Sequence, residues 1–148
     1  MDNTDCDDSD LDVYPGSPIV KTNQNGAQWG DADYWLCDNP TMMADSIVIN
    51  HNAEFNLGSQ TLQASMSVNQ GTLMINSNNI LTLGSPTNPV MVIVYQGGTL
   101  IVDAGATLRI YGTLIQAHGL IINNGHIEVL SAHEDNEVPF VCGTSTVT

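Results

Sequence analysis

Short runs of β-branched and aliphatic residues alternate with polar corners along most of this chain. Residues 46–58 read SIVINHNAEFNLG, residues 72–84 read TLMINSNNILTLG, and residues 99–112 read TLIVDAGATLRIYG. The first two segments align without a gap at an offset of 26, and the third follows at an offset of 27. A fourth copy begins with HIEVL at His126. A period of this length is typical of a chain that repeats one structural unit.

Each copy predicts three strands separated by sharp bends. The first strand leads into a corner of Asn, Asp or Gly, residue types that accept the left-handed backbone of a tight turn. Second strands are expected at 54–57, 80–83 and 107–110, and third strands at 62–68, 90–95 and 120–122. Because one such unit cannot bury its apolar side chains alone, we expect the units to stack about 4.8 Å apart.

The predicted fold is all-β: a short right-handed parallel β-helix (β-solenoid) with about four rungs of 26–27 residues and three strands in each rung. The hand follows the general preference of parallel crossovers. A β-sandwich, whose turns recur about every 8–12 residues, fits locally but does not explain the gap-free similarity. The expected organisation is an acidic tail at 1–27, a Trp-rich cap at 28–45, the solenoid at 46–130, and a C-terminal cap or strand-donating tail at 131–148.

A constant period would place inward side chains in stacked columns. The predicted columns are Ile47, Leu73, Leu100 and Ile127; Ile49, Ile75 and Val102; Phe55, Leu81 and Leu108; and Leu57, Leu83 and Ile110. Corner side chains would stack in the same way, in a ladder of Asn50, Asn76 and Asp103.

The segment before the first copy holds both tryptophans, Trp29 and Trp35, beside Tyr34. We interpret these rings as a plug over the first rung, because the open end of a solenoid exposes unpaired strand edges. The alternative is a carbohydrate-binding platform of Trp29, Tyr34 and Trp35, since exposed rings of this kind stack on sugars.

The stretch from the Trp-rich segment through 44–49 (ADSIVI) and the repeated strands, about residues 28–130, resembles secreted bacterial right-handed β-helix modules related to the G8 type. This resemblance implies a place in a large surface protein, beside adhesive or carbohydrate-active domains in some members. No active-site motif is carried over by it.

The N-terminal segment is strongly acidic. Asp8, Asp10 and Asp12 alternate as ligands do in calcium loops, and Ca²⁺ takes several oxygens at about 2.3–2.6 Å. Residues 5–10 (DCDDSD) and 14–18 (YPGSP) resemble the opening of the Cys-Asp-rich metal-binding repeat of secreted bacterial proteins, whose second half is absent after Ile19. A calcium site is therefore predicted at Asp5, Asp7, Asp8, Asp10 and Asp12, and the alternative is a disordered acidic tail.

Composition limits the classes of partner. Two basic residues stand against 16 acids, giving a formal net charge of −14, so binding to nucleic acid or to anionic membranes is not expected. No apolar run is long enough for membrane insertion. The cysteines Cys6, Cys37 and Cys142 form no zinc-binding spacing. In an exported protein they allow one disulfide, with Cys37–Cys142 and Cys6–Cys37 both open.

The charged side chains between residues 46 and 130 are Glu54, Asp103, Arg109 and Glu128. They do not make the paired carboxylates of a polysaccharide hydrolase, so no enzyme activity is predicted. The strands also lack the lysines that usually guard sheet edges against pairing with another chain. The sequence therefore predicts a non-catalytic extracellular structural or adhesive module that assembles end to end with itself, stabilised by calcium. The alternative is a carbohydrate-binding module of a secreted surface protein, with a polysaccharide as its partner.

Overall fold

The computed structural model describes residues 19–22, 24–31, 35–36, 45–130 and 140–142. Its described residues form strands and turns, with no helix, and nearly all strand pairs are parallel. The strands are β1 (Ile19–Thr22), β2 (Ala27–Gln28), β3 (Trp35–Leu36), β4 (Ser46–Ile49), β5 (Ala53–Phe55), β6 (Ser59–Leu62), β7 (Ser65–Val68), β8 (Gly71–Ile75), β9 (Ile80–Leu83), β10 (Val90–Tyr95), β11 (Gly98–Val102), β12 (Thr107–Ala117), β13 (Leu120–Asn123), β14 (His126–Leu130) and β15 (Phe140–Cys142).

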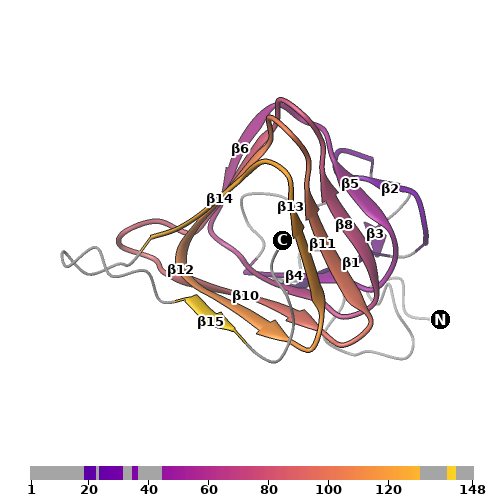
Figure 1. Cartoon of the computed structure of the whole chain (residues 1–148). Coiled ribbons are helices and arrows are strands. Elements are labelled where there is room, and N and C mark those ends of the chain that lie inside the picture. The colour runs from indigo at the N-terminus through magenta and orange to yellow at the C-terminus, as the bar shows by residue number, and fades with distance from the viewer. Residues whose placement is uncertain (1–18, 23, 32–34, 37–44, 131–139, 143–148) are drawn as a thin grey trace.

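The strands surround the core on three sides, so that the molecule is triangular when viewed end-on (Figure 1). We call these sides the first, second and third faces. The first face contains β1, β4, β7, β10, the second half of β12, and β15. The second face contains β2, β5, β8, β11 and β13. The third face contains β6, β9, the first half of β12, and β14.

Strand β12 joins the third face to the first, which makes these two faces one curled ten-stranded sheet. Its first half pairs with β9 and β14, and its second half pairs with β10 and β15. Gly112 lies where the strand passes between the two faces, with φ of 138°. A Cβ atom there would lie 1.9 Å from the carbonyl oxygen of Val90, so this bend requires glycine.

The core follows from the alternation of side chains along each strand. In β11 and in β12 every second residue is buried, as the period of two along a strand requires. The inward residues form one continuous apolar cluster that extends from Trp29 to Val129. Several of its largest members, including Phe55, Leu73 and Leu100, have no solvent exposure.

One neighbouring pair in each predicted column is correct. Leu73 pairs with Leu100, and Ile75 pairs with Val102. Leu81 pairs with Leu108 on the third face. These pairs are 27 residues apart because the chain makes an extra turn at 84–89, where Ser85 and Asn88 hydrogen-bond to each other through their backbones.

The first member of each column was placed wrongly. Ile47 pairs with Met66 and Ile49 with Val68, both 19 residues later and on the first face. Phe55 pairs with Ile75 rather than lying below Leu81. Residues 46–58 and 72–84 look alike because each contains a strand, a corner and a strand, but the two segments occupy different pairs of faces. The offset of 26 between them therefore does not mark a stacking period.

The last copy and Leu57 were also misplaced. Ile127 pairs with Leu108 on the third face rather than following Leu100. Leu57 lies outside any strand and is 47% exposed. Residues paired between parallel strands are thus separated by 19 to 27 positions rather than by a constant 26 or 27. Corners of different length, such as the 84–89 turn, cause this variation.

Asparagine side chains link neighbouring corners, but in a different order from the predicted ladder. Asn69 Nδ2 donates a hydrogen bond to Asn50 Oδ1 at 3.2 Å, so Asn50 neighbours Asn69 rather than Asn76. Asn76 and Asp103 directly follow the paired residues Ile75 and Val102, as predicted. Asn79 is buried, accepts a hydrogen bond from the Gly58 backbone at 2.6 Å, and donates two bonds to the corner carbonyls of residues 76 and 77.

Candidate functional site

The predicted calcium ligands Asp5, Asp7, Asp8, Asp10 and Asp12 lie outside the described residues. Tyr34, Cys6 and Cys37 also lie outside them, and of Cys142 the structure describes only the backbone position in β15. Within the described part of the chain, no three His, Cys, Asp or Glu side chains are grouped as metal ligands. The described residues also contain no helix with the length and apolarity of a membrane span. The calcium and disulfide predictions thus remain predictions.

The two tryptophans are buried in the core. Trp29 makes edge-to-face contacts with Trp35 and Phe55, with ring centroids 5.3 and 5.5 Å apart. Trp35 Nε1 donates a hydrogen bond to the backbone carbonyl of Gln28 at 3.1 Å. These contacts suit a plug over the first strands, and they leave neither indole face open to stack on a sugar ring. Tyr34, the third residue of the predicted sugar platform, lies outside the described residues, so the carbohydrate-binding alternative stays a prediction.

The third face carries a charged cluster on its outer side. Arg109 Nε donates to Glu128 Oε2, and His126 Nε2 lies 3.0 Å from Glu128 Oε1. The hydrogen bond from Arg109 lowers the pKa of Glu128, and the same bond raises the pKa of Arg109. Because all three side chains are partly exposed and lie on neighbouring strands, this cluster has the geometry of a surface ion pair.

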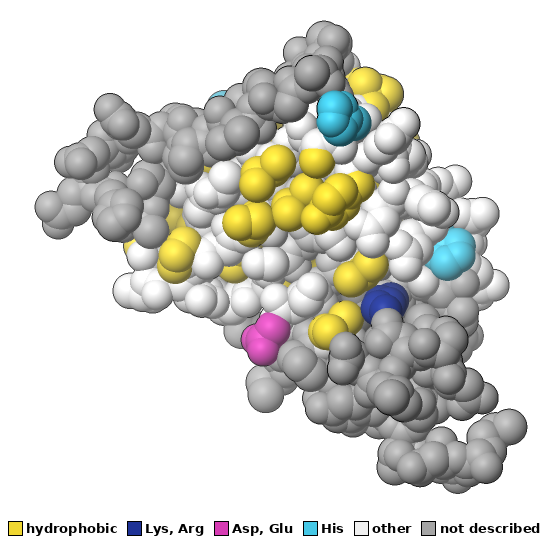
Figure 2. Space-filling view, turned by 90° about the horizontal axis from the view of Figure 1, so that it is seen from below, with side chains coloured by type: hydrophobic (Ala, Val, Ile, Leu, Met, Phe, Trp, Pro, Cys, Tyr) yellow, Lys and Arg dark blue, Asp and Glu magenta, His cyan; other side chains and the backbone are white. Residues whose placement is uncertain are grey.

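The first face has an apolar outer surface over β10 and β12, which we call the first-face patch. Met91 and Tyr95 are 45% and 42% exposed. Ile93 and Ile115 are paired in register between them. Figure 2 shows hydrophobic side chains gathered on this face, with few charged ones among the residues described. A signal for the patch is present in the unbroken apolar run 90–95, since such runs predict strands covered on both sides.

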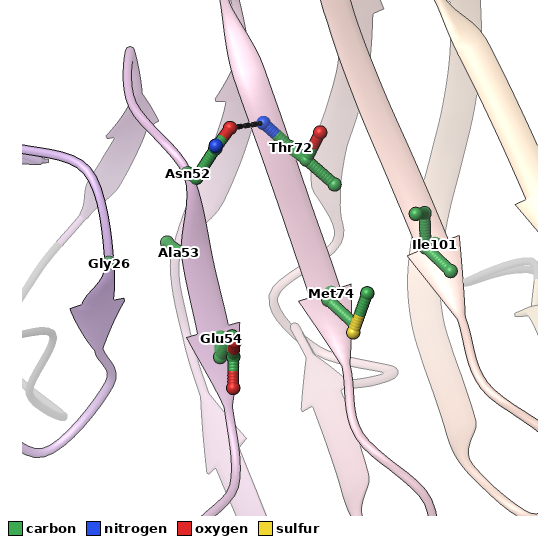
Figure 3. A pocket seen from close by; sticks show the side chains of 7 residues that line it. All are labelled: Gly26, Asn52, Ala53, Glu54, Thr72, Met74 and Ile101. Carbon is green, nitrogen blue, oxygen red and sulfur yellow. Dashed lines mark hydrogen bonds between the residues drawn. The ribbon is translucent and has the colours of Figure 1, made fainter.

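The second face has an open hollow of about 330 Å³ on its outer side, near the end of the sheet that β2 and β5 form. It is lined by residues from β5, β8 and β11 and by the turn before β2 (Figure 3): Gly26, Asn52, Ala53, Glu54, Thr72, Met74 and Ile101. Glu54 pairs in register with Met74, and Met74 with Ile101, so the three outward side chains form one row across the sheet. This row could not be predicted from a constant period, because its paired residues are 20 and 27 positions apart in the sequence.

The last strand of the second face has an open edge within the described structure. Strand β13 pairs with β11, and no other described strand pairs with it. Its outward residue Leu120 is 42% exposed. At the other end of the same face, β2 has β5 as its one described partner. The outer edge of β13 therefore pairs with no described strand, whereas on β2 the Gln28 carbonyl accepts hydrogen bonds from the Asp31 backbone N–H and from Trp35 Nε1.

Comparisons with protein-family models, with curated proteins and with solved structures give no match to this chain.

Proposed function

We propose that this chain is a short β-solenoid that serves as a non-catalytic structural or adhesive module at an extracellular surface. Its strands follow one another around the three faces in a fixed order. β4, β5 and β6 make one rung, β7, β8 and β9 the next, and β10, β11 and the first half of β12 the third. The second half of β12, with β13 and β14, makes a fourth. In this interpretation each rung adds one parallel strand to each face.

The proposed activity is end-to-end association with further copies of the same chain. The observation that carries this proposal is the edge of β13, which pairs with no described strand other than β11, while β2 lies at the opposite end of the same sheet. Both strands run parallel to their neighbours, so β13 of one copy beside β2 of the next would continue the five-stranded sheet in the same direction. A head-to-tail contact of this kind leads to an open filament rather than a closed dimer.

The side chains of these edges support the same proposal. Neither β13 nor β2 contains a Lys or Arg, the residues that usually keep exposed edges apart. The first-face patch adds a second apolar surface by which filaments could contact one another laterally. We further propose that calcium bound by the acidic N-terminal segment reduces the repulsion between copies that each carry a net charge of −14. The proposed extracellular location rests on the sequence resemblances alone.

A lysine placed on the β13 edge tests this proposal. Ile122 is a half-buried outward residue of β13, and Ile122→Lys would put a charge on the row where the next copy is expected to pair. Gln96→Lys, in an exposed turn, adds the same charge away from the edge. By light scattering in calcium-containing buffer, wild type and Gln96→Lys are expected to form large assemblies while Ile122→Lys stays monomeric. Equal assembly of both variants would contradict the role of the β13 edge.

A further inference from the structure

The hollow on the second face combines one carboxylate with an apolar floor. Glu54 projects from β5, and Met74 and Ile101 project from the next two strands in the same row (Figure 3). Adjacent strands lie about 4.8 Å apart, so the row extends roughly 10 Å from Glu54 to Ile101. All three side chains are half-buried, which leaves part of each in contact with solvent.

The carboxylate of Glu54 is held in place by an amide rather than by a cation. Asn76 Nδ2 donates a hydrogen bond to Glu54 Oε2 at 3.0 Å. Among the described residues, no Lys, Arg or His forms an ion pair with Glu54. A carboxylate can accept about four hydrogen bonds, so the one from Asn76 fixes its position and leaves acceptor capacity directed at the hollow.

The other polar groups at the rim of the hollow form hydrogen bonds within the protein. Asn52 Oδ1 accepts a hydrogen bond from the Thr72 backbone at 2.9 Å, as Figure 3 shows. Asn52 in turn donates its backbone N–H to Asn25 Oδ1. The rim is therefore ordered by its own hydrogen bonds, and Glu54 is the one side chain in the lining that carries a full charge.

We propose that this hollow binds a primary alkylammonium group, namely the lysine side chain of a basic partner polypeptide. A lysine consists of a flexible four-carbon stem and a terminal ammonium, and such stems pack on apolar surface while the charge stays near water or an acceptor. The stem would lie on Met74 and Ile101, and the ammonium would donate to Glu54. Neither a neutral sugar nor an anion makes use of both parts of this row.

The charge of the whole molecule favours the same class of ligand. A net charge of −14 attracts cationic partners and increases their rate of encounter. The chain itself contains one lysine, Lys21, so a second copy is a poor source of this ligand. The inferred partner is therefore a different polypeptide, and the inference does not depend on whether the chain forms filaments.

The experiment is an NMR titration of the ¹⁵N-labelled chain with n-pentylamine hydrochloride and with N-acetyl-lysine methylamide, beside the neutral counterparts 1-pentanol and N-acetyl-norleucine methylamide. Both amines are expected to shift the amide signals of residues 54, 74 and 101, and the neutral compounds are not. Glu54→Gln keeps an oxygen that can accept the hydrogen bond from Asn76 but removes the charge. It should weaken the binding of both amines about tenfold.

The matched control is Glu128→Gln, which makes the same change of net charge on the third face. It should leave the affinity for both amines unchanged within twofold. Equal weakening by the two substitutions would show a general effect of net charge and would overturn the site. Binding of pentylamine without binding of the lysine compound would overturn the assignment to a partner polypeptide. Thermal unfolding of both variants confirms that the fold is retained before the titrations are compared.

Discussion

The most discriminating prediction concerns two leucines that a constant period of 26 would make equivalent. Leu83 has no solvent exposure and pairs in register with Leu62 and Ile110 on the third face. Replacing it with alanine removes buried methyl groups and leaves a cavity, which costs about 3 kcal/mol in tightly packed cores. For a chain of this length that loss corresponds to a fall of roughly 6–12 °C in melting temperature.

Leu57→Ala is the matched control, because it is the same chemical change at a residue that is 47% exposed. Its expected cost is below about 1 kcal/mol, since most of the side chain's transfer free energy is not realised at the surface. The assay is urea unfolding at 25 °C, comparing free energies of unfolding at unchanged m-value. Equal losses for the two variants would refute the strand pairing described above and would favour the constant period.

Three further predictions follow from individual contacts. Gly112→Ala should prevent stable folding because its Cβ would overlap a carbonyl of the neighbouring strand. Gly58 also has a positive φ but has open space around it, so Gly58→Ala should cost about 1 kcal/mol of folding stability. Soluble yield and thermal melting distinguish the two variants. Glu128→Gln should destabilise by less than about 1 kcal/mol at pH 7, since the ion pair with Arg109 is partly exposed. Because folding lowers the pKa of Glu128, the stabilisation by this ion pair is present above the unfolded pKa near 4.5 and is lost as the pH falls through the folded pKa. The difference in melting temperature between Glu128→Gln and wild type should therefore be smaller at pH 3 than at pH 7. Asn79→Ala should cost about 2–3 kcal/mol in urea unfolding, because it removes the three hydrogen bonds that this buried side chain makes with the Gly58 N–H and with the carbonyls of residues 76 and 77. A cost under about 0.5 kcal/mol, on the order of an ordinary surface substitution, would contradict that role.

The all-β character of the described residues could be predicted from the sequence because alternation and corner chemistry are local signals. The strands at 80–83 and 90–95 and the pairing of Leu73 with Leu100 were predicted correctly. The stacking of Ile47 could not be found in this way, because an apolar strand followed by a polar corner looks the same on every face. The register is decided by the length of each corner, and the six-residue turn at 84–89 lengthens the separation of paired residues on the second and third faces to 27.

The candidate sites were harder to predict for the same reason. The row of Glu54, Met74 and Ile101 brings together residues at unequal spacings, so no single period reveals it. The tryptophans were open to two interpretations, since an aromatic cluster suits either a plug or a platform until its burial is known. In the structure both tryptophans are buried, and Trp29 packs against Phe55.

The measurement that tests the central proposal most directly is negative-stain microscopy with light scattering on the full chain, in added calcium and in chelator. We expect thin unbranched filaments in calcium and shorter or no assemblies after chelation, because stacked copies would continue the parallel sheets and calcium would offset the charge of −14. A stable monomer under both conditions, at protein concentrations of about 100 µM where exposed edges readily associate, would contradict end-to-end assembly.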